Sequence, residues 1–169
     1  DTLLEGGSDD DVLYANAGND ILIGGAGDDR LGGTGANQMY GGTGSDTYYV
    51  NNDGDDIHES SAADGGADSV WSSLIEYRLP DYVENLFLLP NESGISINND
   101  LNAEGNELNN TIQGNNGDNT LDGKGGDDRI YGGKGENILV GGAGFDLVDY
   151  STHFTTIDVD LLIGLGRGG

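Results

Sequence analysis

Residues 105–149 read GNELNNTIQ-GNNGDNTLD-GKGGDDRIY-GGKGENILV-GGAGFDLVD, which is five segments of nine residues in unbroken register. Each segment begins with glycine, has aspartate or asparagine at its sixth position and has an aliphatic residue at its eighth. Two positions that keep different chemical preferences through five copies indicate a structural repeat rather than low-complexity sequence. The stretch therefore predicts a solenoid whose unit is nine residues long.

The same pattern fills the N-terminal part of the chain. Segments begin at Gly6, Ala15, Gly24, Gly32 and Gly41, the one at Gly24 is a residue short, and Val50–His58 is a degenerate copy. The eighth position is apolar or aromatic in every copy: Leu13, Leu22, Leu31, Met39, Tyr48, Ile57, Ile112, Leu121, Ile130, Leu139 and Val148. These side chains are the predicted core. Asp1 is interpreted as the sixth position of a preceding copy.

The chemistry of the repeat explains both preferences. Residues seven to nine suit a short strand whose middle side chain points inward, and residues one to six suit a turn in which glycine allows positive φ. One repeat is too small to bury a face, so neighbours must stack. Calcium prefers 6–8 oxygen ligands, more than one turn can offer but within reach of two stacked turns. The pattern thus predicts metal between turns and folding coupled to binding.

These repeats resemble the repeats-in-toxin (RTX) family of secreted bacterial proteins. The resemblance implies an all-β fold, a right-handed parallel β-roll with two repeats per coil, and calcium ions in rows along both edges. It also implies that sixth-position side chains bind calcium with help from turn carbonyls. The implied ligands are Asp11, Asp20, Asp29, Asn37, Asp46, Asp55, Asp68, Asn110, Asn119, Asp128, Asn137 and Asp146, with Gly25, Gly27, Gly42, Gly44, Gly133, Gly135, Gly142 and Gly144.

Alternation of successive repeats between two edges predicts how these side chains are grouped. Asp11, Asp29 and Asp46 should share one edge of the first block, and Asp20, Asn37 and Asp55 the other, provided that the short repeat does not break the alternation. In the second block, Asn110, Asp128 and Asp146 should oppose Asn119 and Asn137. Aspartate offers a charged carboxylate where asparagine offers a neutral oxygen, so calcium should fill the Asp128–Asp146 edge first.

The composition of the chain excludes several classes of binding partner. The 169 residues include 31 acidic and six basic ones, for a formal charge of −25. Such a chain repels nucleic acid and anionic lipid, and no apolar run approaches the ~20 residues of a membrane span. There is no cysteine, so disulfides cannot stabilise the fold and bound metal is the expected substitute.

Four segments are predicted: a first RTX block at 1–58, inter-block strands that continue or cap the roll at 59–104, a second block at 105–149, and the start of a further inter-block segment at 150–169. The last is expected to be truncated, which makes the chain part of a longer polypeptide. Trp71, Tyr77, Tyr82 and Phe87 form either a ligand-facing surface or a metal-free continuation of the core, and the second alternative is favoured.

Three functional hypotheses remain. The first is a calcium-binding structural module, linked to type I secretion, that folds outside the cell. The second is a polysaccharide- or surface-binding module of an adhesin or an extracellular carbohydrate-active enzyme. The third, a hydrolase, lacks a catalytic group: His58-Glu59 has no second zinc ligand at Ala62. We therefore expect no enzymatic activity and no catalytic residues, and we expect Leu121 to be buried and Asn115 to be exposed.

Overall fold

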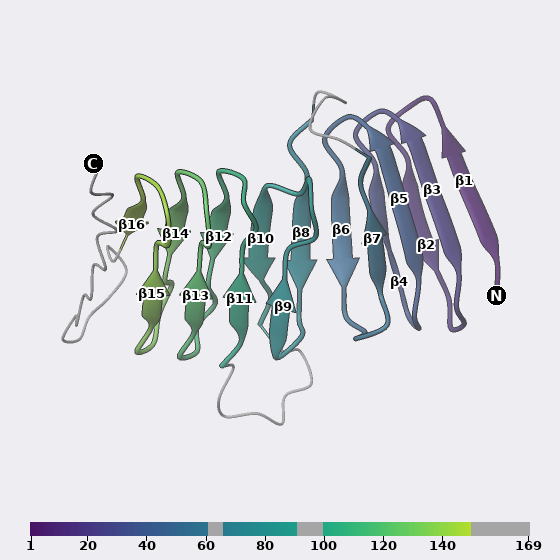
Figure 1. Ribbon diagram of the computed structural model, residues 1–169. Coiled ribbons are helices and arrows are strands. Elements are labelled where there is room, and N and C mark those ends of the chain that lie inside the picture. The colour runs from purple at the N-terminus through teal and green to yellow at the C-terminus, as the bar shows by residue number, and fades with distance from the viewer. Residues whose placement is uncertain (61–65, 91–99, 150–169) are drawn as a thin grey trace.

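The computed structural model describes residues 1–60, 66–90 and 100–149. These residues form a β-solenoid of about seven turns, and no helix occurs in the described ranges. All strand pairings are parallel. Figure 1 shows the coils stacked side by side from the N-terminus to β16. The predicted all-β parallel β-roll is therefore confirmed.

One long sheet extends along the roll and two shorter sheets share the opposite side. The long sheet contains β2 (Val12–Ala15), β4 (Arg30–Gly33), β6 (Thr47–Val50), β8 (Ser69–Ser72), β10 (Asn85–Leu88), β12 (Thr111–Gln113), β14 (Arg129–Tyr131) and β16 (Leu147–Asp149). The first short sheet contains β1 (Leu3–Gly7), β3 (Ile21–Ala26), β5 (Gln38–Thr43) and β7 (Asp56–His58). The second contains β9 (Glu76–Arg78), β11 (Asn102–Glu104), β13 (Thr120–Asp122) and β15 (Ile138–Val140).

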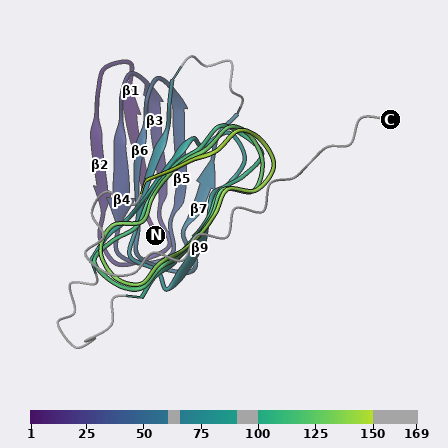
Figure 2. The same ribbon diagram turned by 90° about the vertical axis from the view of Figure 1, so that its left-hand side faces the viewer.

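Strands pair with the strand two repeats away, as expected when two repeats make one coil. Leu31 pairs with Leu13 on one side and with Tyr48 on the other. The short repeat at Gly24 therefore leaves the register intact. Figure 2 looks along the stack and shows the coils of the second half lying one behind another as flattened loops.

The core is the interior of these loops. The predicted eighth positions are buried from Leu13 to Leu139, and Leu22, Leu31, Met39, Tyr48, Ile112, Leu121 and Ile130 are completely inaccessible. Val148 is half-buried because its strand is the last described strand of the long sheet. Nonapeptide register thus identifies the core side chains at the eighth positions, while others such as Val70, Leu86 and Ala103 come from outside the repeats.

The segment between the two blocks supplies β8, β9 and β10. Val70 and Leu86 of β8 and β10 are completely buried between their neighbours in the long sheet. Tyr77 takes an eighth-position place beside Ala103 and packs against the core. Tyr82 is exposed in a turn with φ 70°. The four aromatic side chains of this segment therefore do not form one surface.

Trp71 and Phe87 point to the outer face of the long sheet, where their rings stack 4.7 Å apart. The predicted inter-block segment at 150–169 lies outside the described residues. Within those that are described, no helix has the length and apolar character needed to cross a membrane.

Candidate metal sites at the edges of the roll

The first candidate row consists of the residues that immediately precede the strands of the long sheet. They are Asp11, Asp29, Asp46, Asp68, Glu84, Asn110, Asp128 and Asp146. The backbone N–H of Asp11 donates to Oδ1 of Asp29 at 2.8 Å, and the N–H of Asp29 donates to Oδ1 of Asp46 at 2.8 Å. The same bond joins Asp46 to Asp68 and Asp128 to Asp146. Carboxylates from distant parts of the sequence are thereby stacked along one edge.

Glu84 belongs to this row although the repeat pattern does not identify it. Its Oε2 accepts the backbone N–H of Asp68 at 2.8 Å, as an aspartate oxygen does elsewhere in the row. Glu84 lies directly before β10, in a segment without glycine turns, so no repeat position marked it in the sequence.

The second row precedes the strands of the two short sheets and is discontinuous. It consists of Thr2, Asp20, Asn37, Asp55, Ile75, Leu101, Asn119 and Asn137. Asp20 N–H donates to Asn37 Oδ1 at 3.3 Å, and Asn119 N–H donates to Asn137 Oδ1 at 2.8 Å. Ile75 and Leu101 interrupt it with apolar side chains. Metal ligation is therefore better supported along the first row.

The interpretation of Asp1 as a sixth position was wrong. Leu3 pairs with Ile21, so Thr2 lies opposite Asp20 and Asp1 lies opposite Asn19. Thr2 N–H donates to Asp20 Oδ1, and Asp1 Oδ1 accepts the N–H of Asn19 at 3.0 Å. Asp1 occupies the fifth position.

Fifth-position side chains form an exposed ladder that the sequence pattern did not reveal. Oδ1 of Asp10 accepts the backbone N–H of Asp28, whose own Oδ1 accepts the N–H of Ser45, both at 2.8 Å. Asp127 and Phe145 form the same bond in the second block. In this ladder the backbone N–H of the later repeat donates to the side chain of the earlier one. In the sixth-position row the backbone N–H of the earlier repeat donates to the side chain of the later one. Neighbouring turns are thus joined in both directions.

Asp29 and Asp128 show why these turns suit a cation. Each side chain is 1% exposed. Their Oδ1 atoms are hydrogen-bonded, but each Oδ2 has no hydrogen-bond partner among the described residues. Burial raises the pKa of Asp29 and raises that of Asp128 to about 6, with nearby acids contributing in both cases. A buried carboxylate oxygen with no donor is costly unless a cation or a proton neutralises it.

A backbone oxygen converges on the same place. A Cβ built on Gly123 would lie 2.1 Å from Oδ2 of Asp128 and 2.4 Å from the carbonyl oxygen of Gly141. On Gly24 it would lie 2.2 Å from Oδ2 of Asp29 and 2.7 Å from the carbonyl oxygen of Gly41. Only glycine leaves this space open at the first position. Carboxylate and carbonyl oxygens from stacked turns are the donors that calcium prefers, so these turns fit the ion.

The glycines predicted as carbonyl ligands all adopt positive φ. Gly25 and Gly27 both have φ 118°, and a Cβ on Gly25 would lie 2.1 Å from the carbonyl oxygen of Gly7 in the adjacent coil. Positive φ also occurs at Gly42, Gly44, Gly133, Gly135, Gly142 and Gly144. Turns stacked this closely require glycine for both conformation and space.

Asp46 and Asp68 are accompanied by Glu59, which sequence analysis missed as a site residue. One carboxylate oxygen from each of the three lies within 4.8 Å of the others. The Tyr48 hydroxyl donates to Glu59 Oε1. Burial raises the pKa of the Tyr48 hydroxyl, helped by the hydrogen bond to Glu59 and by the surrounding carboxylates. Glu59 has no repeat position, because it follows β7 where the period breaks.

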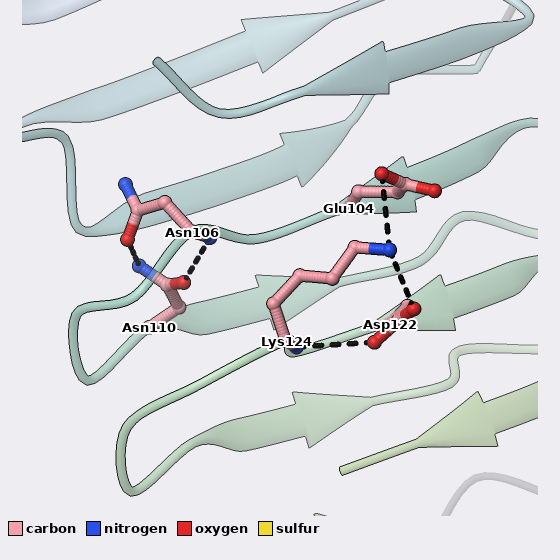
Figure 3. Close-up of polar contacts among 5 residues, drawn as sticks. All are labelled: Glu104, Asn106, Asn110, Asp122 and Lys124. Carbon is pink, nitrogen blue, oxygen red and sulfur yellow. Dashed lines mark hydrogen bonds and ion pairs between the residues drawn. The ribbon is translucent and has the colours of Figure 1, made fainter. Parts of the chain in front are cut away.

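Lys124 stands at a second position where glycine is usual, with φ 75°. Its Nζ lies 2.8 Å from Asp122 Oδ2 and 3.2 Å from Glu104 Oε2 (Figure 3). These two acids raise the pKa of the ammonium group. The lysine charge is therefore paired at the ends of β11 and β13, so it does not neutralise Asp128.

Comparison with known proteins gives one match. The family model of the RTX calcium-binding nonapeptide repeat matches four times, at residues 1–31, 31–57, 104–139 and 113–148. Neither the curated proteins nor the solved structures contain a significant match.

Proposed function

Since this chain belongs to the family of RTX calcium-binding nonapeptide repeats, we propose that it is a calcium-dependent structural module of a larger secreted bacterial protein. The observation that supports this most directly is the pair of buried Oδ2 atoms of Asp29 and Asp128 beside turn carbonyls. A calcium ion would supply the positive charge there. No catalytic role is assigned to the chain.

Without calcium, several free-energy terms disfavour the folded roll relative to the unfolded chain. Its formal charge is −25, and the first row places carboxylates next to one another at the edge of a thin core. Self-repulsion, desolvation of buried carboxylates and the backbone entropy of 32 glycines all oppose folding. Calcium opposes the first two. Folding therefore follows calcium concentration, and the module stays open in a calcium-poor cytosol and folds after export.

Residues of both turns in a stack would hold the ion. In the clearest case these are Asp128 and the first-position carbonyl of Gly141, and in the first block they are Asp29 and the carbonyl of Gly41. Asp46, Asp68 and Glu59 together offer three carboxylates whose nearest oxygens lie within 4.8 Å of one another. Each of these groups joins different coils, so binding at any of them stabilises the stack and not just one turn.

Far-ultraviolet circular dichroism tests the proposal. Calcium-depleted protein should lack most of its β-structure and gain it as calcium reaches millimolar concentration. Magnesium at the same concentration is the control and should substitute poorly, because it requires compact octahedral coordination and retains its water. A calcium-depleted chain with the full β spectrum would contradict the proposal.

Polysaccharide binding is the second candidate, and one surface favours it. The outward residues of the long sheet form two rows. The first is Val12, Arg30, Thr47, Ser69, Asn85, Thr111, Arg129 and Leu147, and the second is Tyr14, Gly32, Tyr49, Trp71, Phe87, Gln113, Tyr131 and Asp149. Asp149 is the one acidic residue among these described positions, in a chain with 31 acids.

Aromatic rings beside hydroxyl and amide groups suit a sugar polymer, whose apolar ring faces stack on aromatics while its hydroxyls form hydrogen bonds. Affinity electrophoresis in calcium, with hydroxyethyl cellulose and with polygalacturonate, tests this candidate. Trp71→Ala and Phe87→Ala should abolish retardation. The matched control Phe145→Ala removes a 90% exposed ring elsewhere. Migration unaffected by either polymer would exclude the role for these two glycan classes.

A further inference from the structure

Two turns of the second block are closed by paired carboxamides. Asn110 and Asn119 hold the sixth positions, and Asn106 and Asn115 hold the second positions of the same turns. Asn110 Oδ1 accepts the backbone N–H of Asn106 at 2.8 Å, and Asn110 Nδ2 donates to Asn106 Oδ1 at 3.1 Å (Figure 3). Asn119 and Asn115 repeat both bonds, at 2.9 and 3.1 Å.

All four side chains are buried, so Asn115 is not exposed as its turn position suggested. Asn106 Oδ1 also accepts the N–H of Leu108, and Asn115 Oδ1 accepts that of Gly117. These bonds account for the polar groups that a metal would otherwise have to satisfy.

An asparagine turn and an aspartate turn differ at the side-chain oxygen that lies beside the first-position glycine. Asn110 Oδ1 lies 2.4 Å from the point where Gly105 would carry a Cβ, with the carbonyl oxygen of Gly123 at 2.5 Å. Asp128 Oδ2 takes the corresponding place beside Gly123. The asparagine oxygen there accepts a hydrogen bond from its own turn, whereas Asp128 Oδ2 has no hydrogen-bond partner in the described part of the chain.

The second side-chain atom differs as well. Oδ1 of Asp128 accepts the backbone N–H of Asn110, whereas Nδ2 of Asn119 donates to the carbonyl oxygen of Leu101 at 2.8 Å. Asn110 Nδ2 likewise donates to the carbonyl of Glu84 at 3.2 Å. A carboxylate at position 119 would set its oxygen against a carbonyl oxygen. In this orientation the carboxamide forms a hydrogen bond that a carboxylate cannot form.

The coil that faces the turn of Asn110 offers backbone carbonyls to its amide pair. Asn106 Nδ2 donates to the carbonyl oxygens of Pro80 and Val83, both at 2.8 Å. Residues 80–84 contain no glycine, so they cannot supply the stacked glycine turn found opposite Asp29. The Asn106–Asn110 pair thus lies where a repeat turn meets a turn without glycine.

We infer that the turns of Asn110 and Asn119 bind no calcium, and that their carboxamides replace the ion at the start of the second block. This inference rests on the proposed function, since it divides the predicted ligands into metal-binding and metal-free turns. Asn137 is not included, because its Oδ1 accepts the backbone N–H of Asn119, the same contact that sixth-position aspartates make in the first row.

Native mass spectrometry at saturating calcium counts bound ions and tests the inference. Asn110→Ala and Asn119→Ala should each retain the wild-type number of calcium ions. The control Asn116→Ala, which changes an exposed asparagine in the turn of Asn119, should retain it as well. Asp29→Ala and Asp128→Ala should each lose at least one ion. Loss of an ion from Asn110→Ala or Asn119→Ala would overturn the inference.

A second measurement needs no variant. Calcium anomalous scattering from wild-type crystals should place no ion about 2.3–2.6 Å from Oδ1 of Asn110 or Asn119. A calcium peak at that distance from either atom would overturn the inference while leaving the proposed function intact. Wild-type protein that binds no calcium at all would instead refute the proposed function.

Discussion

The hydroxyl of Tyr48, in the centre of β6, donates a hydrogen bond to Glu59, which follows β7 on the opposite side of the roll. Tyr48 is completely buried, and its pKa is raised, so the hydroxyl keeps its proton and remains a donor. The other eighth positions of the repeats are aliphatic or methionine. One core side chain therefore contacts the acidic cluster of Asp46, Glu59 and Asp68 directly.

Tyr48→Phe keeps the buried ring and removes this donor. Loss of a hydrogen bond to this half-buried carboxylate should cost about 1–3 kcal/mol of unfolding free energy. The loss should be larger at low calcium than at saturation, because the ion then compensates Glu59. Chemical denaturation at two calcium concentrations measures the loss of unfolding free energy. Equal losses at both concentrations would show that the Tyr48 hydrogen bond is not coupled to calcium binding.

Glu59→Gln should raise the calcium concentration at the midpoint of folding severalfold, since it removes one of three charges from the cluster. Glu136→Gln is the control, because it makes the same change at an exposed fifth position. Both are read by circular dichroism titration. An identical midpoint for the two variants would remove Glu59 from the ligand set.

Leu121→Ala should destabilise the calcium-bound roll by about 2–5 kcal/mol, the usual cost of truncating a fully buried leucine. Asn116→Ala, at an exposed position of the preceding turn, should have little effect. Denaturant unfolding compares the two. Equal destabilisation would show that the core register is misassigned.

The pKa of Asp128 gives a pH dependence with a definite sign. An unfolded aspartate titrates near 3.9, whereas burial places this one at about 6 in the calcium-free fold. Between these values the folded chain binds more protons, so its stability rises as pH falls through this window and is lost as pH rises through about 6.

Protons and calcium therefore compete at this carboxylate. Calcium-depleted protein should gain β-structure on acidification from about pH 7.5 to about pH 5, and less calcium should be needed to reach the midpoint of folding over the same range, because the proton already stabilises the folded chain. Circular dichroism follows both changes. A calcium midpoint that does not change with pH would exclude a role for buried carboxylates in the linkage.

Asp128→Ala should weaken calcium binding more than Asn137→Ala. Asp128 contributes a charged, buried oxygen to a continuous row, whereas Asn137 contributes a neutral group to an interrupted one. Isothermal titration compares the two variants. A larger effect at Asn137 would reverse the assignment of the stronger edge.

Within the two repeat blocks, the register was sufficient to predict the eighth-position core and the sixth-position rows, because the position of a residue in the nonapeptide determines where it lies in a coil. Leu22, Ile130 and Asp29 lie where their register places them. The register contains no information about Glu59, whose contact depends on how an insertion returns to the roll. Asp46 and Asp68 are 22 residues apart, and no periodic pattern predicts what lies between them.

The repeat pattern also does not predict how a sixth-position side chain is oriented. Asn119 and Asn137 share a register, yet the Nδ2 of Asn119 faces a carbonyl oxygen while the Oδ1 of Asn137 faces an N–H. Asn119 Oδ1 is instead used within its own turn, where it accepts the N–H of Asn115. Sequence analysis that treats each repeat separately does not predict these contacts.

The two sides of the roll differ in continuity, and this has a mechanical consequence. The long sheet is hydrogen-bonded from β2 to β16, whereas on the other side no ladder joins β7 to β9 in the described strands. A bending load that stretches the long sheet must break a ladder, but one that opens the other side at β7 meets no such resistance. Among the described strands, the roll should therefore bend more easily between β7 and β9 than where the sheets are continuous, with the long sheet as the more rigid side.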